Sequence, residues 1–533
     1  MKKYLVCCVV CATLTNVVAT DKTWDGSGIN NKWASAANWD ADTLPAAGDV
    51  LFFGGATQLS NSNNLAANTA FNGINFNVGA GSFVLSTNAI NLAGNITNNS
   101  LNLQTISLSV ALQQDVVITT GAGITLSGVV SGAHSITKVG SGVLTLGGNN
   151  LFTGLILSEG TINNTSSNSG VLGNGNLTMS NNTRIVNSAN ALFVSVVPSG
   201  SGNVQIENGG TVTFEVQSAG ARASTGGNNF VGNGTYGNGV TIVKAGLGTL
   251  NINQGNNLFG GTVANTYRVD AGLLEFSSDV RLGNPNNKLV LNGGGLYIAD
   301  STTLGGSRAL ILQGPNGIIN VNTAKTFSIN ASGQISGTGG LNKTGGGQLT
   351  IGAPQSYTGG TFVTSGTLLL SGTGSVTGPV TVASGATLSS PGIFSNDLTL
   401  NGGATLGGAG SFRPVELSII GDVSGGSFSA VGLGSTSFVK DGDLTLTLGN
   451  MEVGVYSLFS GGLLSGQFGS VVVNGFTLNP LGGGNFGGQS GQFLYTFANN
   501  TSTLSVVPED PAWALLAFSG TIVMILRRRR IIR

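Results

Sequence analysis

The chain has 533 residues, of which 88 are glycine, 40% are apolar and only 8% are charged. Disorder needs low hydrophobicity together with a high net charge, and because this chain has neither, the composition favours an ordered chain with many turns. Between residues 20 and 506 the chain carries 14 basic and 19 acidic residues, a net charge near −5, with no basic stripe. Proteins that bind nucleic acid usually carry a cluster of basic residues on one face, so this charge distribution argues against nucleic-acid binding.

The first 19 residues are typical of a secretory signal peptide. Two lysines precede a short apolar run, and Val17 and Ala19 fit the small residues found before a cleavage site. We therefore expect cleavage after Ala19, with a short buried helix as the alternative. Cys7, Cys8 and Cys11 all lie in this run, so the mature chain would have neither disulfides nor a cysteine-based metal site.

Three longer segments of the chain share one pattern. It reads Lys-x-Gly-x-Gly-x-Leu-x-Ile/Leu, a polar turn, Phe/Tyr-x-Gly, and a strand ending in Gly-x-Leu/Ile. The segments are 136–164, 242–278 and 341–372, and their lysines are Lys138, Lys244 and Lys343. Three shorter segments follow a related pattern of a strand, a glycine turn and a second strand. They are 116–128, 380–390 and 398–408.

Within these repeats "VLTL", "TLNI" and "QLTI" alternate apolar and polar residues with a period of two, as half-buried strands do. Leu144, Leu250 and Leu349 occupy one equivalent position, which predicts that all three point into a core. Because no stretch from 20 to 506 has a sustained helical period, we predict an all-β, right-handed parallel β-helix. Antiparallel hairpin modules or β-sandwiches are the alternative.

The repeat pattern resembles the autotransporter-associated β-strand repeat. The copy at 341–372 matches it nearly throughout, and the copy at 242–278 carries an insertion. Residues 20–60 resemble the N-terminal cap of proteins with such repeats. We expect their three tryptophans to cover the first coil as a hydrophobic plug, with sugar stacking as the alternative; they are Trp24, Trp33 and Trp39. The resemblance implies a solenoid over 61–410, followed by a β-rich region over 411–506.

The last segment, 507–533, joins a short motif, an apolar run and an arginine cluster. It resembles the PEP-CTERM sorting signal, with Asp510 standing where the family has its second proline. The run 511–526 would form a helix of about 24 Å, somewhat short of the ~30 Å hydrocarbon core of a bilayer. The predicted sorting residues are Val507, Pro508, Glu509, Arg527, Arg528, Arg529 and Arg530.

This second resemblance implies a precursor held in the inner membrane by its tail and cut by an exosortase-type enzyme. The arginines would mark the cytoplasmic side of the membrane. A permanent anchor is the alternative. In either case residues 20–506 would face outward.

Few residues are candidates for catalysis. His134, the only histidine, lies between expected strands and is interpreted as a turn residue. Two close acidic pairs, Asp40 with Asp42 and Asp441 with Asp443, are interpreted as turn residues too, because neither has the neighbours that glycoside chemistry needs. We predict no catalytic residue, no metal site and no cofactor.

Together these observations predict an exported, non-enzymatic structural or adhesive protein. It would present its β-solenoid at the cell envelope or in an extracellular polysaccharide matrix, with that polysaccharide as a partner. The matrix follows from the resemblance of the tail and not from composition. A polysaccharide-active enzyme or a carbohydrate-binding β-helix protein is the alternative.

Overall fold

The computed structural model describes residues 20–168, 170–189, 194–195, 203–224, 230–231, 238–252, 263–424 and 427–508. The chain divides into two compact units, Met1–Asn265 and Thr266–Arg533. In the described residues nearly all regular structure is β-strand, and the short 3₁₀ helices are η1 (Ala36–Asn38), η2 (Asp40–Asp42) and η3 (Asp279–Leu282). No described helix is long and apolar enough to cross a membrane. The expected helix over 511–526 lies outside the described residues.

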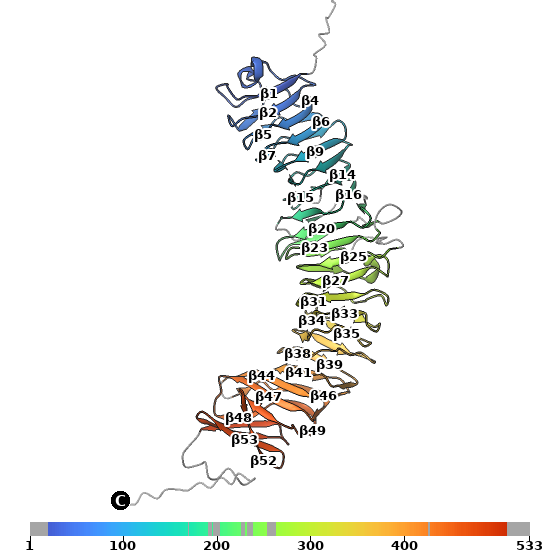
Figure 1. Ribbon diagram of the computed structural model, residues 1–533, viewed down its shortest axis with the longest axis vertical. Coiled ribbons are helices and arrows are strands. Elements are labelled where there is room, and N and C mark those ends of the chain that lie inside the picture. The colour runs from blue at the N-terminus through green and yellow to red at the C-terminus, as the bar shows by residue number, and fades with distance from the viewer. Residues whose placement is uncertain are drawn as a thin grey trace, which may run out of the picture. The chain divides into compact units, whose positions relative to one another are not determined.

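The first unit is a stack of coils whose strands form parallel sheets (Figure 1). The first sheet contains β1 (Asp21–Trp24), β2 (Val50–Phe53), β4 (Thr69–Phe76), β6 (Ile90–Asn98), β9 (Val116–Thr120), β12 (Ser135–Val139), β14 (Gly154–Leu157), β16 (Asn176–Met179), β19 (Val204–Ile206) and β22 (Phe230–Val231), with β8 (Val110–Leu112) beside β6 and β11 (Val130–Ser131) beside β8. The second contains β3 (Ser60–Asn63), β5 (Val84–Thr87), β7 (Leu103–Ile106), β10 (Gly123–Leu126), β13 (Val143–Leu146), β15 (Thr161–Asn164), β17 (Thr183–Asn187), β20 (Thr211–Val216) and β23 (Thr241–Ala245). A shorter third sheet contains β18 (Val194–Ser195), β21 (Arg222–Ser224) and β24 (Thr249–Asn251).

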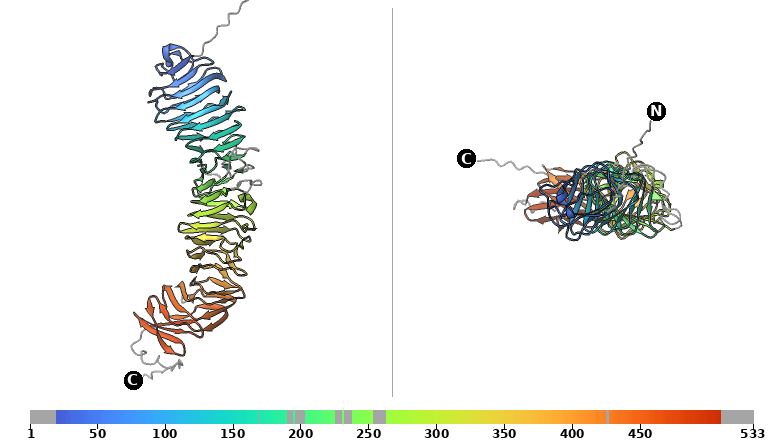
Figure 2. Two further views of the ribbon diagram at one scale, coloured as in Figure 1. Left: turned by 45° about the vertical axis from the view of Figure 1, so that its right-hand side comes forward. Right: turned by 90° about the horizontal axis from the view of Figure 1, so that it is seen from above.

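The second unit repeats this arrangement with its own strands, whose stacking is visible in the left view of Figure 2. One sheet contains β25 (Thr266–Val269), β27 (Lys288–Asn292), β30 (Leu310–Gln313) and β33 (Ile335–Gly337). Another contains β26 (Leu273–Phe276), β28 (Gly295–Ile298), β31 (Asn316–Val321), β34 (Gly340–Thr344), β36 (Thr361–Val363), β38 (Val380–Val382), β41 (Leu398–Asn401), β44 (Glu416–Ser424), β47 (Asp443–Gly449) and β50 (Val471–Val473). The third contains β29 (Thr302–Thr303), β32 (Thr326–Ile329), β35 (Gln348–Ile351), β37 (Thr367–Leu370), β39 (Thr387–Ser389), β42 (Thr405–Gly407), β46 (Val431–Lys440), β43 (Ser411–Phe412), β40 (Ile393–Phe394) and β49 (Phe459–Gly466).

Among the described strands, antiparallel pairing appears only near the C-terminal end, and a single isolated antiparallel bridge joins Trp24 to Trp39. Two short strands, β45 (Ser427–Phe428) and β51 (Phe476–Thr477), fold back on β44 and β50. A separate five-stranded antiparallel sheet contains β48 (Gly454–Ser457), β55 (Thr503–Pro508), β54 (Phe493–Ala498), β53 (Asn485–Ser490) and β52 (Asn479–Gly482). The predicted all-β parallel solenoid is therefore confirmed, and the hairpin-module alternative is wrong for the stacked coils.

Inward-facing side chains of successive coils form apolar ladders. In the first unit, parallel register places Ile124 beside Leu144, Leu144 beside Ile162, and Ile162 beside Ile185. In the second unit Phe327, Leu349, Leu368, Leu388 and Leu406 follow one another in the same way. Every one of these side chains has no exposed surface, and Leu250 is equally buried. The prediction that Leu144, Leu250 and Leu349 point into the core is confirmed.

Replacing Leu349 with Asp should destabilise the coils around β35, because it would bury a charge with no partner. Loss of a buried Leu side chain alone costs about 2–5 kcal/mol. Since coils contact mainly their neighbours, limited proteolysis should cut near residues 326–388 and leave the first unit protected. Thr350→Asp is the matched control, because Thr350 faces outward from the same strand. Equal protection of both variants would show that this register is wrong.

Candidate functional site

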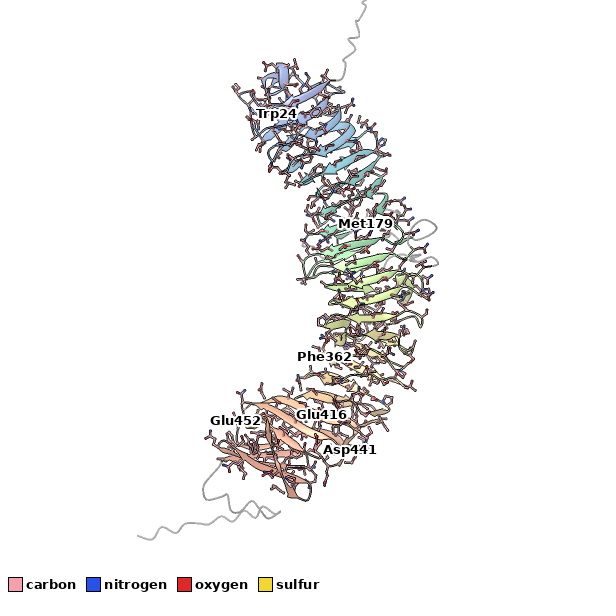
Figure 3. All side chains as sticks on the ribbon, viewed as in Figure 1. Trp24, Met179, Phe362, Glu416, Asp441 and Glu452 are labelled. Atoms are coloured by element: carbon pink, nitrogen blue, oxygen red, sulfur yellow. The ribbon has the colours of Figure 1, made fainter. Side chains whose placement is uncertain are left out.

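The three tryptophans of the N-terminal segment form a buried aromatic cluster beside β1 (Trp24 is labelled in Figure 3). Trp39 packs edge-on against Trp24 and Trp33, with ring centroids 5.3 and 5.9 Å away, and Phe53 lies against all three indoles. Each indole N–H has an acceptor: Trp33 donates to Asn61 at 2.8 Å, Trp39 to the Trp33 carbonyl at 2.8 Å, and Trp24 to the Thr57 carbonyl at 3.4 Å. At most 1% of each residue is exposed, so these rings plug the core and offer no face to a sugar.

The signature lysine of each repeat lies inside the solenoid at a corner between two strands. Lys138 Nζ donates to the carbonyl oxygens of Val139, Gly140 and Glu159 at 3.1, 2.5 and 3.0 Å. The Glu159 carboxylate in turn accepts the Gly140 N–H at 2.8 Å. The ammonium group therefore joins carbonyls of its own coil to one of the next coil.

The other two repeats build the same corner. Lys343 Nζ donates to Thr344, Gly345 and Ser365 carbonyls at 2.8, 2.8 and 3.0 Å. Lys244 Nζ donates to Ala245 and Gly246 carbonyls, both at 2.7 Å. The three lysines are at most 1% exposed. The three sequence segments are thus structurally equivalent at this position.

The glycine two residues after each lysine makes this corner possible. Gly140, Gly246 and Gly345 have φ of 82°, 72° and 75°, a left-handed conformation that L-residues with a side chain rarely adopt. A Cβ on any of them would lie 2.2–2.6 Å from a backbone oxygen of the preceding coil. The Lys-x-Gly pair therefore serves the turn, with glycine bending the chain and lysine donating to the carbonyls beside the bend.

Burial lowers the pKa of these lysines. The pKa of Lys138 falls to about 8, and the Glu159 carboxylate partly opposes the effect. The pKa of Lys244 falls to about 7 and that of Lys343 to about 8. The carbonyl oxygens around each Nζ favour its charged form, but desolvation is the larger effect.

Sequence reasoning missed a buried ion pair in the second unit. Arg308 has no exposed surface, and its guanidinium donates to the Asp279 carboxylate at 2.7 and 3.1 Å. It also donates to the carbonyls of Asn284, Asn287 and Gly283 at 3.1–3.2 Å, which ties together the loop that follows η3. Twenty-nine residues separate the pair, so no local pattern indicated it.

The predicted turn residues are placed separately and form no shared site. His134 Nδ1 lies 3.7 Å from an Asp115 oxygen, and both side chains are exposed. Asp40 accepts the Thr23 N–H at 2.9 Å, while Asp42 has a φ of 48°. No group of three or more His, Cys, Asp or Glu residues that could hold a metal ion occurs in the described chain.

The second acidic pair is also divided. Asp441 forms an ion pair with Arg413 at 2.5 Å beside a shallow hollow, whereas Asp443 begins β47 in register with Glu416 of β44. Glu452 follows the far end of β47, away from Asp441 (Figure 3). These carboxylates therefore do not converge on one point.

Outward-facing positions form rows of hydroxyl groups along the coils. In the first unit Thr105, Thr125 and Thr145 follow one another in register. In the second unit the rows are Thr367, Thr387 and Thr405 on one sheet and Thr381, Thr399, Ser418 and Thr445 on another. Neighbouring strands of a sheet lie about 4.8 Å apart, so each row repeats its hydroxyl at that spacing.

The predicted processing residues lie mostly outside the described residues. Val507 and Pro508 end β55, opposite Leu494 and Phe493 of β54. Glu509, Arg527, Arg528, Arg529 and Arg530 lie outside the described part of the chain, as does the predicted cleavage residue Ala19.

Two segments, residues 136–163 and 341–370, match a passenger-associated-transport-repeat family model. They coincide with the first and third predicted repeats, and each contains one lysine corner. No curated protein and no solved structure is significantly similar to the chain. The matched repeats and the parallel solenoid together fit a surface protein of the passenger type.

Replacing Lys244 with Met should cost more stability at high pH than at neutral pH. The folded pKa of Lys244, about 7, lies below the ~10.4 of an unfolded lysine. Between these values the unfolded chain binds more protons, so Lys244 makes stability rise with pH. From pH 7 to 9.5 the unfolding free energy of wild type should rise by about 3 kcal/mol relative to that of Lys244→Met, at ~1.4 kcal/mol per pH unit once the folded amine is deprotonated. Chemical denaturation at several pH values measures it.

Lys325→Met is the control, because Lys325 is partly exposed and pairs with Asp300. Its stability difference from wild type should vary little over the same range. If the stability difference between wild type and Lys244→Met instead stays constant or shrinks as pH rises, folding does not lower the pKa of Lys244 and the prediction is wrong.

Proposed function

We propose that this chain is an exported, non-enzymatic structural or adhesive protein that presents a β-solenoid at the cell envelope or in an extracellular polysaccharide matrix. The observation that carries the proposal is the coincidence of the two family-matched repeats with coils of a parallel solenoid. The lysine and glycine corners that the three repeats share lie inside the stack. This pattern supports a role for the repeats in building a stalk, not in turning over a substrate.

The outer surface supports contact with neutral polymers. Its regular rows are threonine and serine hydroxyls, and only 8% of the whole chain is charged. A hydroxyl donates and accepts hydrogen bonds as the hydroxyls of a polysaccharide do. Extracellular polysaccharide is therefore the partner that this surface fits best.

The proposed route to the surface uses both ends of the chain. A leader ending at Ala19 would direct export, and the tail would hold the precursor in the inner membrane. Val507, Pro508 and Glu509 would be recognised by an exosortase-type enzyme, with Arg527–Arg530 on the cytoplasmic side. In support of this arrangement, the described pairs of β55 with β54 run up to Pro508, so a cut just after it would keep every one of these pairs.

A polysaccharide-active or carbohydrate-binding protein is the second candidate. The observation that favours it is the shallow hollow beside Asp441, which Ile393, Arg413, Pro414 and Val415 also line. Asp441 is already paired with Arg413, so its carboxylate is engaged by a cation within the protein.

Intact mass spectrometry of the released protein tests the tail. We expect the mature form to end between Pro508 and Asp510. Glu509→Gln should leave the precursor in the membrane fraction, because the apolar run is unchanged and only the recognised motif is lost. Replacing Arg527–Arg530 with glutamine should instead let the precursor slip through the membrane, since the positive charges that resist translocation are gone. A released form that still carries Trp513 would show that the tail is a plain anchor.

Incubation of the exported protein with neutral and acidic polysaccharides separates the two functions. We expect co-sedimentation with neutral polymers and no new reducing ends. Asp441→Asn should change neither result, and Asp422→Asn, which alters another carboxylate of the second unit, is the matched control. Turnover that only Asp441→Asn abolishes would contradict the structural function and establish the enzyme.

A further inference from the structure

Asp49 is a buried carboxylate without a cationic side-chain partner. It is 1% exposed, and it is the only charged residue between Asp42 and Asp115. The ion pairs found among the described residues do not include it. Because a buried charge is costly unless it is paired, such a carboxylate calls for a cation from another source.

The backbone nitrogen of Thr20 lies at this carboxylate. Thr20 N–H donates to Asp49 Oδ1 at 2.9 Å, and Thr20 Oγ1 lies 3.3 Å from the same oxygen. Asp49 Oδ2 accepts the Ala46 N–H at 2.8 Å. The Thr20 carbonyl accepts the Val50 N–H at 3.2 Å. Thr20 is thus held on both sides just before β1.

We propose that Asp49 is the binding site for the α-ammonium group that removal of residues 1–19 creates on Thr20. The proposal rests on the proposed function in that it requires export and cleavage after Ala19. Hydrolysis of the Ala19–Thr20 amide by a leader-removing protease adds one water, which leaves a carboxylate on Ala19 and an amine on Thr20. At neutral pH that amine takes up a proton and becomes the cation that Asp49 lacks.

The geometry needs no rearrangement for this pairing. The nitrogen is the same atom before and after cleavage, and 2.9 Å is the usual distance of a hydrogen bond between an ammonium and a carboxylate. Before cleavage the contact is between a neutral amide and a charge. Cleavage turns it into a partly buried ion pair, since Asp49 is buried and Thr20 is exposed. This pair fastens β1, which pairs with β2 at the start of the first sheet.

The other charged groups near β1 are engaged elsewhere or exposed. On β1 itself Lys22 donates to Thr43 and Asp21 is exposed. On η2 Asp40 accepts the Thr23 N–H, and Asp42 is exposed. The neighbouring strands β2 and β4 contain no charged residue.

The pairing has a defined pH dependence. The α-amino group of an unfolded chain titrates near pH ~8, and a neighbouring carboxylate raises the pKa of an amine. The contribution to stability is therefore fully present below pH ~8 and is lost as pH rises through the raised value.

The test uses the whole chain, expressed with its own leader in a host that removes signal peptides. The first residue of the exported protein is identified, and acylation of its α-amine is followed at pH 8 by mass spectrometry of the N-terminal peptide. We expect Thr20 as first residue and a rate ~5-fold slower than in Asp49→Asn, because raising the pKa of the amine from ~8 by about one unit lowers its unprotonated fraction at pH 8 from about one half to about one tenth. Asp42→Asn, the matched control, should react like wild type.

A second measurement needs no variant that might fail to fold. The same reaction on the wild-type protein is followed from pH 7 to 10, folded and in denaturant. The folded α-amine should reach half of its full reactivity at a higher pH than the denatured one.

Equal reactivity of wild type and Asp49→Asn, or equal half-points in the folded and denatured states, would overturn the proposal. An exported protein that begins at another residue would overturn it too while leaving export intact. A chain that is retained inside the cell with Met1 in place would overturn both the pairing and the proposed function.

Discussion

Every coil of this solenoid has to turn without leaving buried carbonyl groups unpaired. Apolar ladders supply the core, but a tight corner directs carbonyl oxygens inward, where water cannot reach them. The lysine of each repeat resolves this conflict, because one ammonium group donates to two carbonyls of its own corner. At Lys138 and Lys343 it also donates to a third carbonyl, in the next coil. The corner thus couples neighbouring coils through the same atoms that complete the turn.

This role explains why the repeat joins lysine to glycine at fixed spacing. Glycine allows the positive φ that bends the chain, and lysine is long enough to reach the carbonyls that the bend turns inward. Arginine has the length and charge, but its planar guanidinium directs its donors in a fixed fork, whereas an ammonium group can rotate to meet three carbonyls. At Arg308 a planar guanidinium is used instead. It donates to the Asp279 carboxylate and to carbonyl groups of a wider loop.

The sequence predicted the stacked strands because period-two alternation depends on local burial alone. The inward leucines followed from that pattern. The same pattern places Lys138 inward, two residues after Ile136, but a lysine is so seldom fully buried that alternation alone does not predict its burial. Arg308 with Asp279, and Thr20 with Asp49, could not be predicted, because each pair is made by coil stacking between residues 29 positions apart. The five-stranded antiparallel sheet was foreseen only as a β-rich region.

Because charged residues are scarce in this chain, each buried ionic group has a larger part in holding the chain in place. Between Asp49 and Asp115 the chain has no charged residue, and from 453 to 508 it has none either. Five of the buried charges lie where the chain must be held in place: Lys138, Lys244 and Lys343 at repeat corners, Arg308 behind η3 and Asp49 beside Thr20. Glu215 and Glu275 are buried within strands β20 and β26 instead. Lys440 follows the same rule, since its buried ammonium contacts the Asn499 carbonyl between β54 and β55. It thereby joins strand β46 of the stack to the antiparallel sheet 59 residues further on. In a stack held mainly by non-directional apolar burial, such contacts are what specify where a coil begins, turns and ends, because a displaced charge would lose every partner at once.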